Sequence, residues 1–236
     1  MEEFARVGAA RVFLLRSKAL RPTRGIYVSA GIHGDEPAGP EALITWAEKN
    51  QERLASLPLL LFPCLNPWGL VNNCRFDEAG IDLNRVFHLE TRPVVVALKR
   101  VLAPYRFAVA LNLHEDFDGQ GFYLYEVQHE KPFWGETLLA AARPFIRIEG
   151  RTRIDGRKAA DGLIRRRFEK KRFARIGYPE AVWLHLHHTQ RALTLETPSE
   201  FAMEQRVHAQ MAVIDECIRR ASAANNHPRG ASEMAP

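Results

Sequence analysis

The chain has 236 residues, a length that suits one large α/β domain better than two compact domains. Hydrophobic residues make up 46% and charged residues 26%, which is typical of globular proteins and argues against a disordered, collagen-like or disulfide-stapled chain. The 33 Lys and Arg residues outnumber the 28 Asp and Glu residues, giving a net charge of +5. This basic balance raises the question of a nucleic-acid or membrane-surface partner.

No segment has the features of a targeting or membrane sequence. The N-terminus begins with acidic residues and lacks an apolar run followed by a small-residue cleavage site. No apolar run reaches the ~20 residues that span a bilayer. Cys64, Cys74 and Cys217 have neither the even count of a disulfide framework nor the spacing of a zinc or redox motif. We therefore expect a soluble cytoplasmic protein with reduced cysteines.

Short apolar runs alternate with longer segments of helical spacing, which predicts a single α/β domain with a mixed, mostly parallel twisted sheet flanked by helices. Strands are expected at 11–15, 25–30, 59–62, 107–113, 121–127, 181–186 and 192–195. Helices are expected at 37–50, 93–102, 133–144, 161–175 and 200–223. This domain is expected to cover 1–222, and the polar, Pro- and Gly-containing segment 223–236 is expected to be a disordered tail.

Two histidines and a glutamate stand at the carboxyl ends of predicted strands. His33 and Glu36 follow the strand 25–30 and are separated by two residues, so both side chains can reach one ion. His114 ends the strand that precedes it, and open α/β sheets bind ligands outside the carboxyl ends of their strands. Two His and one Glu form the ligand set of a catalytic zinc, whereas Glu115 is expected to face the other way. On its own, His33 is equally compatible with a hydrogen-bonded loop histidine.

Further motifs lie in the long loop 63–85 and beyond it. The loop contains NPWG at 66–69, Arg75 and DLNR at 82–85, and TLETP follows at 194–198. Together with 33–36 and His114, these motifs resemble the zinc carboxypeptidase family and its deacylase relatives, aspartoacylase and succinylglutamate desuccinylase. The motifs occur in the order that the family shows.

The resemblance implies a zinc carboxypeptidase-like fold and one zinc ion per chain. His33, Glu36 and His114 match the metal ligands of the family. Asp82 resembles the aspartate that accepts a hydrogen bond from a zinc-binding histidine, a contact that fixes the orientation of the ring.

The resemblance also implies catalytic and substrate-binding roles. Glu196 resembles the general base, which accepts a proton from the attacking water and passes it to the leaving amine. Arg75 resembles the arginine that stabilises the oxyanion. Asn84 and Arg85 resemble the pair that binds the terminal carboxylate of the substrate. Tyr178 lies eighteen residues before Glu196 and is the candidate for the tyrosine that closes over bound substrate.

The leading hypothesis is a zinc metallocarboxypeptidase that hydrolyses the C-terminal amide bond of a peptide or peptide-like substrate. The alternative is an N-acyl-amino-acid deacylase of the succinylglutamate desuccinylase/aspartoacylase type, whose substrate differs in the group on the acyl side of the amide bond. Deacylases of this family usually add a C-terminal barrel domain, and only 40 residues follow Glu196, which favours the peptidase. The rival from another class is a non-enzymatic module that binds anions or nucleic acid, whose affinity would fall with salt and survive a chelator.

Two groups of residues near the motifs can be interpreted in more than one way. His185, His187 and His188 precede the Glu196 strand, where they are expected on an exposed strand face. A second metal is conceivable there, and a substrate contact is more plausible. Tyr123 and Tyr125 alternate along a predicted strand and are expected to be core or sheet-face aromatics rather than site residues.

The basic residues are concentrated in one segment. Seven of the eleven residues at 165–175 are Lys or Arg, which predicts a solvated helix face or, alternatively, a basic lid over the active site. We therefore attribute the positive charge to this helix and to the binding of a substrate. This substrate is expected to be a peptide or an N-acyl amino acid of anionic character. Neither a nucleic-acid partner nor a membrane partner is expected.

Overall fold

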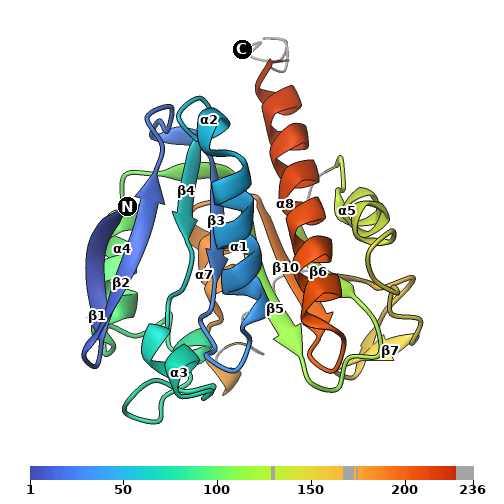
Figure 1. Ribbon diagram of the computed structural model, residues 1–236, viewed down its shortest axis with the longest axis horizontal. Helices are drawn as coiled ribbons and strands as arrows, with labels where there is room; N and C mark the ends of the chain where they lie inside the picture. The colour runs from blue at the N-terminus through green and yellow to red at the C-terminus, as the bar shows by residue number, and fades with distance from the viewer. Residues whose placement is uncertain (129–130, 167–172, 174, 227–236) are drawn as a thin grey trace, which may run out of the picture.

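The computed structural model describes residues 1–128, 131–166, 173 and 175–226. Eight strands form one sheet in the order β1-β2-β4-β3-β5-β10-β6-β9 (Figure 1). Their bounds are β1 (Glu2–Val7), β2 (Ala10–Arg16), β3 (Thr23–Ala30), β4 (Leu59–Phe62), β5 (Arg106–Asp116), β6 (Tyr123–Gln128), β9 (Leu163–Arg166) and β10 (Arg191–Pro198). The central strands β4, β3, β5 and β10 run parallel, and antiparallel pairs flank them.

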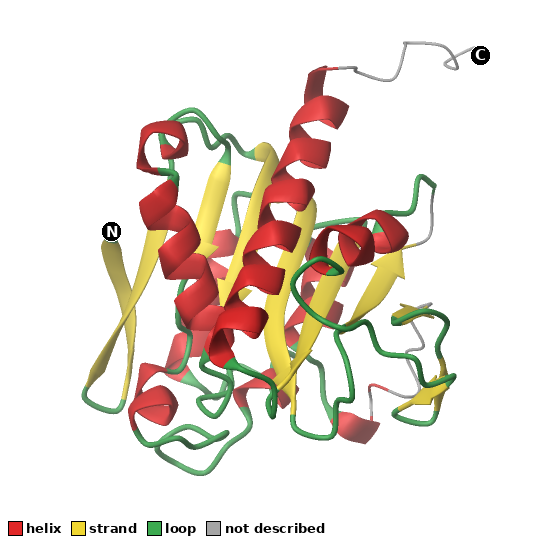
Figure 2. Cartoon of the chain, turned by 45° about the vertical axis from the view of Figure 1, so that its right-hand side comes forward, coloured by secondary structure: helices red, strands yellow, loops and turns green. Residues whose placement is uncertain are grey.

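Helices cover both faces of this sheet. The helices α1 (Ala38–Lys49), α5 (Gly135–Ala142) and α8 (Met203–Asn226) pack together on the face turned to the viewer in Figures 1 and 2. The opposite face carries α4 (Pro93–Leu102) and α7 (Glu180–His187). The shorter elements are α2 (Gln51–Leu54), α3 (Pro67–Val71), a 3-10 turn η1 (Leu83–Arg85) and the two-stranded pair β7 (Arg153–Ile154) and β8 (Arg157–Lys158).

The central strands are apolar on consecutive positions because each of their faces is covered. One core, with Leu111 and Leu193 at its centre, lies between the sheet and α1, α5 and α8. The other core, which includes Tyr27 and Phe107, lies between the sheet and α4 and α7. Strands of a parallel sheet that are covered on both faces need apolar side chains on consecutive positions, which explains runs such as LLLF at 59–62.

On the α7 face, polar side chains replace apolar ones toward the carboxyl ends of β5 and β10. Asn112 lies opposite Thr194, and His114 lies opposite Glu196 in the parallel register of these two strands. Because side chains alternate between faces along a strand, all four point to the same side of the sheet. The fold therefore brings the motif around residue 114 and the motif around residue 196 side by side.

The predicted fold class is confirmed, but two predicted elements are wrong. The segment 181–186 is part of the helix α7 rather than a strand. A short apolar run fits either element, and here Pro179 and Glu180 start a helix that buries Val182 and Leu184. The predicted helix 161–175 begins instead with the strand β9, which pairs with β6. Residues 167–172 and 174 of that prediction lie outside the described residues.

The ends of the chain also differ from the prediction. The strand β1 was not predicted, and it pairs antiparallel with β2 at the edge of the sheet. The helix α8 continues to Asn226, so residues 223–226 of the expected tail are helical. Residues 227–236 of that tail lie outside the described residues. All three cysteines are free thiols, and burial raises the pKa of Cys64 to about 11 and that of Cys217 to about 12.

Candidate metal centre and active site

The three candidate metal ligands converge at the carboxyl edge of the sheet. His33 lies in the loop after β3, Glu36 lies just before α1, and His114 lies near the end of β5. The Glu36 carboxylate contacts both rings: the His33 Nδ1 to Oε1 distance is 2.6 Å and the His114 Nδ1 to Oε2 distance is 2.8 Å. The three residues are only 3%, 6% and 4% exposed. Sequence analysis named this trio, and the structure brings it together.

The trio fits a metal ion by its chemistry. Two imidazole nitrogens and a carboxylate oxygen lie within 4.8 Å of one another, and no other such group of His, Cys, Asp or Glu occurs among the described residues. Two His and one Glu leave a coordination position open, as in catalytic zinc sites. Burial opposes charge on Glu36, but His114 and His33 lower the pKa of its carboxyl group to about 2. Glu36 is therefore ready to bind a cation as a carboxylate.

A close backbone contact holds the loop that carries His33 and Glu36. A Cβ atom on Gly34 would lie 2.0 Å from the carbonyl carbon of Gly69 in α3. Only glycine permits such a close approach of the two backbones, so Gly34 is needed for the contact between this loop and α3. The neighbouring Glu115 faces the other side of the sheet, as expected, where its carboxylate accepts hydrogen bonds from the Ala38 N–H and from Arg206.

Asp82 connects the metal trio to Arg75. Its Oδ1 lies 3.2 Å from His33 Nε2 and accepts a hydrogen bond of 2.8 Å from the Asn84 N–H. Its Oδ2 accepts two hydrogen bonds from the Arg75 guanidinium, at 3.1 and 3.2 Å. Burial opposes ionisation, but His33 and Arg75 hold the pKa of Asp82 well below its usual range. Asp82 thus fixes the ring of His33 from the side opposite Glu36.

Arg75 reaches the metal trio itself. Its Nη1 lies 3.5 Å from Glu36 Oε1, and its side chain is 35% exposed. A fixed cation at this place can stabilise an anion that forms beside the trio.

Asn84 and Arg85 are positioned by the segment that leads into α7. The Asn84 Oδ1 accepts a hydrogen bond of 2.8 Å from the Glu180 N–H, which leaves the Nδ2 group of Asn84 as its donor toward the cavity. Gly177 lies so close to Arg85 that a Cβ atom would come within 2.1 Å of the Arg85 carbonyl oxygen. The two predicted carboxylate-binding residues therefore rest on the backbone of 177–180.

Glu196 lies across the sheet register from His114 and beside the metal trio. The register pairs it with His114 on one side and with Tyr123 on the other. Burial and the carboxylates of Glu36, Asp116 and Asp155 raise the pKa of Glu196 well above its usual range, while Arg75 opposes this. A carboxylate whose pKa is raised is a stronger base than an ordinary glutamate, which suits acceptance of a proton from water.

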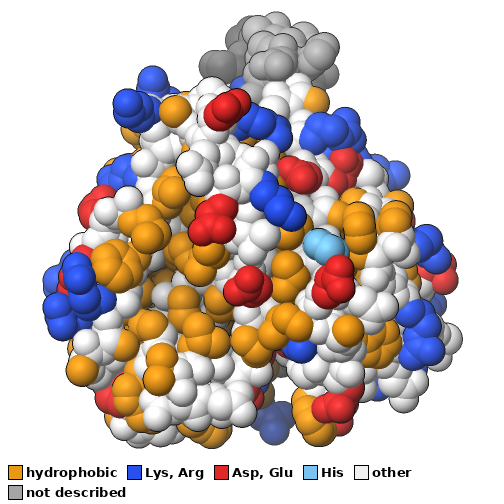
Figure 3. Space-filling model, in the orientation of Figure 1, with side chains coloured by type: hydrophobic (Ala, Val, Ile, Leu, Met, Phe, Trp, Pro, Cys, Tyr) orange, Lys and Arg blue, Asp and Glu red, His pale blue; other side chains and the backbone are white. Residues whose placement is uncertain are grey.

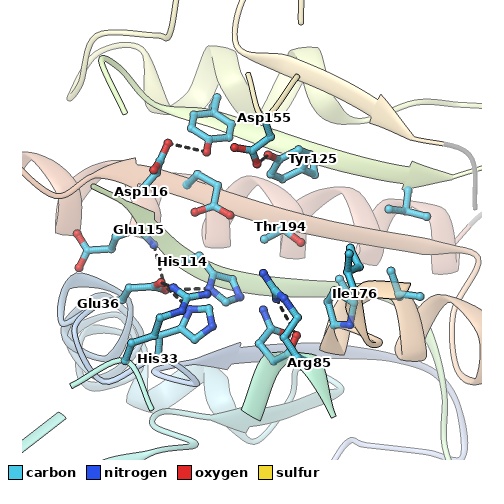
Figure 4. A pocket seen from close by; sticks show the side chains of 18 of the residues that line it. His33, Glu36, Arg85, His114, Glu115, Asp116, Tyr125, Asp155, Ile176 and Thr194 are labelled. Atoms are coloured by element: carbon cyan, nitrogen blue, oxygen red, sulfur yellow. Dashed lines mark hydrogen bonds and ion pairs between the residues drawn. The ribbon is translucent and has the colours of Figure 1, made fainter. Parts of the chain in front are cut away.

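One cavity contains all of these groups. It has a volume of about 260 Å³ and is lined by the metal trio, Arg75, Asn84, Arg85 and Glu196 (Figure 4). Its remaining described lining residues are Glu115, Asp116, Tyr123, Tyr125, Val127, Asp155, Phe173, Ile176, Pro179, Ala181, Val182 and Thr194.

Tyr123 and Tyr125 are buried in an apolar cluster, as the expected core position requires, and they also line this cavity. Their hydroxyl groups donate hydrogen bonds to Asp116, at 2.8 Å, and to Asp155, at 2.5 Å. What the sequence did not show is that their strand, β6, pairs with the Glu196 strand, β10. Two more carboxylates, Asp116 and Asp155, enter the cavity with them, and sequence analysis did not name either as a site residue.

Tyr178 does not line the cavity. Its ring lies 5.3 Å from that of His88, and its carbonyl oxygen accepts a hydrogen bond of 3.2 Å from the Phe87 N–H. The neighbouring Ile176 and Pro179 line the cavity instead. The structure thus leaves the expected substrate-covering tyrosine beside the site rather than in it.

His185 and His187 of α7, and His188 just after it, lie apart from the cavity lining. His185 and His188 are buried, and His188 Nδ1 lies 2.9 Å from the Tyr105 carbonyl oxygen. The exposed strand face expected for them is wrong because the segment is helical. No second metal group forms within the part of the chain that the structure describes.

Charges of both signs are interspersed on the face shown in Figure 3. From the basic segment 165–175, Arg165 is described, and its guanidinium pairs with Glu126 and Glu136. The other residues expected to form a solvated helix or a lid lie largely outside the described residues. Among the residues that are described, no helix is both long and apolar enough to cross a membrane.

Comparisons with known proteins agree with this geometry. The model of the succinylglutamate desuccinylase/aspartoacylase catalytic domain matches residues 22–143. A carboxypeptidase 2 from Trichophyton rubrum is 26% identical over 107 residues, which cover 41% of this chain and 19% of the fungal protein. The chain thus spans about a fifth of that relative.

Solved structures share the fold. A candidate metallopeptidase from Shewanella amazonensis SB2B superposes with a TM-score of 0.80 at 22% identity, covering 93% of this chain and 86% of that chain. A murein-tripeptide amidase from Escherichia coli O157 gives a TM-score of 0.61 at 17% identity, covering 92% and 91%. A carboxypeptidase A from Helicoverpa armigera gives 0.64 at 14% identity, covering 96% and 69%.

Proposed function

The chain belongs to the succinylglutamate desuccinylase/aspartoacylase catalytic domain family, and we propose that it is a zinc-dependent metallocarboxypeptidase. The reaction would be hydrolysis of the amide bond that joins a C-terminal amino acid to a peptide or peptide-like acyl group. The observation that carries this proposal is the single cavity in which His33, Glu36 and His114 face Glu196 and lie beside Arg85.

His33, Glu36 and His114 would hold the zinc ion. When bound there, zinc supplies Lewis acidity, which polarises the scissile carbonyl and makes water a stronger acid. The protein contributes an arranged donor set, because Asp82 holds the Nε2 side of His33 and leaves Nδ1 directed at Glu36.

Recognition of the substrate would begin at its carboxylate. Arg85 offers a planar guanidinium that can donate two parallel hydrogen bonds to a carboxylate. Asn84 adds an N–H donor, since its Oδ1 is already occupied by the Glu180 N–H. These contacts would place the scissile carbonyl next to the metal trio and Arg75.

Glu196 would transfer the proton, and Arg75 would stabilise the negative charge that develops on the carbonyl oxygen. The Glu196 carboxylate would accept a proton from the attacking water and deliver it to the nitrogen of the leaving amino acid. Arg75, 3.5 Å from Glu36, would stabilise the oxyanion as the carbonyl is attacked.

The second candidate function is deacylation of an N-acyl amino acid. The family match at 22–143 favours it, whereas the carboxypeptidase relative supports the peptidase. Both reactions need the same metal trio, base and carboxylate anchor, and they differ in the group on the acyl side of the amide.

One set of substrates separates these outcomes. The zinc-loaded full chain is incubated with N-acylated dipeptides and with N-acetyl and N-succinyl amino acids that share the same last residue, and release of that residue is measured. We expect dipeptide hydrolysis that a chelator abolishes and that disappears when the terminal carboxylate is amidated. Faster hydrolysis of the N-acyl amino acids would identify the deacylase instead. Release of no amino acid from any substrate would refute both.

A further inference from the structure

Asp155 stands at the tip of the hairpin formed by β7 and β8, outside the part of the chain matched by the family model. Asp155 and Gly156 have φ values of +50° and +68°. An Asp-Gly pair with positive φ at both positions is the preferred two-residue turn of a β-hairpin. This turn brings the Asp155 side chain to the lining of the cavity that contains the metal trio.

Asp155 is itself exposed, but its neighbours fix its position. The Tyr125 hydroxyl donates a hydrogen bond of 2.5 Å to Asp155 Oδ2. Next to Asp155, the buried side chain of Ile154 packs in a cluster with Tyr123, Tyr125 and Ile164. The strand β6 and the hairpin are therefore held together, and the carboxylate has a defined place at the cavity.

Asp155 forms no ion pair with a described Lys or Arg side chain. None of the described Lys or Arg side chains lies within 4.0 Å of its carboxylate, in contrast to Asp82, which pairs with Arg75. A carboxylate that faces a substrate cavity without a counter-charge favours ligands that bring a cation and disfavours ligands that bring an anion.

The arrangement of the cavity shows where such a cation would lie. In Figure 4, Arg85, Thr194 and Asp155 follow one another across the cavity, and the metal trio lies to one side of this line. A leaving amino acid whose carboxylate binds Arg85, and whose amide nitrogen faces the trio, would extend its side chain past Thr194 toward Asp155.

The cavity also contains apolar side chains, which suit an aliphatic stem. Val127, Ile176 and Val182 line the same cavity. A methylene chain can bury against apolar side chains while its charged end reaches a polar partner. A lysine-like side chain combines both features.

We propose that Asp155 is a specificity-determining residue, which selects substrates whose leaving amino acid carries a cationic side chain on an aliphatic stem. The inference rests on the proposed function for the orientation of the substrate. It modifies the expectation of an anionic substrate: the leaving residue would carry one carboxylate, for Arg85, and one ammonium group, for Asp155.

The test compares three substrates that differ only in the last residue, which is lysine, norleucine or glutamate. Wild-type protein, Asp155→Asn and Asp161→Asn are assayed with each. Asp161→Asn is the matched control, because Asp161 also has positive φ, at +47°, precedes a glycine and is exposed, but does not line this cavity. Both variants change the charge equally, and asparagine tolerates this backbone conformation.

We expect Asp155→Asn to lower the preference for lysine over norleucine about 10- to 100-fold, as loss of a hydrogen bond between charged groups predicts. Asp161→Asn is expected to keep the wild-type preference, and Asp155→Lys is expected to shift it toward glutamate. An unchanged ratio of lysine to norleucine turnover in Asp155→Asn would overturn the inference.

A binding measurement separates this inference from the proposed function. Titration calorimetry with free L-lysine and free L-norleucine reports recognition of the leaving residue without any turnover. Lysine binding that is weakened in Asp155→Asn but not in Asp161→Asn supports the inference even if no substrate is hydrolysed, in which case only the proposed function fails. Hydrolysis without any lysine preference, together with equal binding of the two amino acids, would leave the function standing and refute the role of Asp155.

Discussion

Removal of the Asp82 carboxylate tests how the metal trio is held. Asp82 accepts hydrogen bonds from His33 Nε2, from the Asn84 N–H and from both Nε and Nη2 of Arg75. Asp82→Ala removes all four contacts. Asp82→Asn can keep the contacts made through Oδ1, but its amide N–H groups would face the Arg75 guanidinium, a donor against a donor.

The structure gives the expected magnitude and order of the two effects. Loss of a partner that orients a metal-binding histidine weakens metal affinity about 10- to 100-fold. Asp82→Ala frees both the His33 ring and Arg75, so we expect it near the upper end of this range. Asp82→Asn retains an acceptor for His33 and is expected nearer 10-fold.

The assay is competition for zinc against a chromophoric chelator. Glu78→Gln is the matched control, because Glu78 lies in the same loop and pairs with Arg92, away from the trio, and its replacement changes the charge by the same amount. Zinc affinity within twofold of wild type in Asp82→Ala, with Glu78→Gln also unchanged, would refute the inference that Asp82 holds His33 for the metal.

Three further predictions concern the base, a buried acid and the oxyanion. Asp116→Asn should move the acid limb of the kcat/KM profile to lower pH, because Asp116 raises the pKa of Glu196, which must lose its proton to act as a base; an unmoved limb would contradict this coupling. Burial raises the pKa of Glu180, so the folded state keeps a proton that the unfolded chain releases above its ordinary value of 4.5. The free energy of unfolding should therefore fall as pH rises from that value, and urea titrations of Glu180→Gln should show a smaller fall than wild type. Arg75→Gln should lower kcat by about 100- to 1000-fold at saturating zinc in steady-state assays, and a kcat near that of wild type would exclude Arg75 from oxyanion stabilisation.

The metal trio could be predicted because its position depends on local sequence and on a simple rule of sheet topology. His33 follows β3 and His114 lies near the end of β5, and these parallel neighbouring strands have their carboxyl ends at one edge of the sheet. Glu196 joins them because β10 is the next parallel neighbour of β5. Prediction of β3, β5 and β10 as strands was therefore sufficient to place these residues at the same edge of the sheet.

The remainder of the cavity depends on contacts that a single sequence does not encode locally. The apolar run 181–186 fits a strand or a helix, and only its packing against β5 and β10 selects the helix α7. The basic residues near 165 favour a helix by propensity, yet pairing with β6 makes 163–166 a strand. Asp155 lies on a two-residue turn far from every motif, so nothing in its surroundings marked it as part of the site.

The charge of the chain also acquires a different explanation. Arg75 and Arg165 each pair with carboxylates, and Arg85 lines the cavity. The cavity itself contains carboxylates opposite Arg85, so it combines both signs instead of offering a basic surface. Such a cavity suits a small zwitterionic ligand better than a polyanion.

The central claim is that the His33, Glu36 and His114 trio holds a zinc ion that acts together with Glu196. The most direct test measures zinc content and hydrolysis of N-acylated dipeptides in wild-type protein and in Glu196→Gln. We predict near one equivalent of zinc in both proteins, turnover by wild type that a chelator abolishes, and almost no turnover by Glu196→Gln. A purified protein without zinc, or a Glu196→Gln variant that hydrolyses these substrates at the wild-type rate, would contradict the claim.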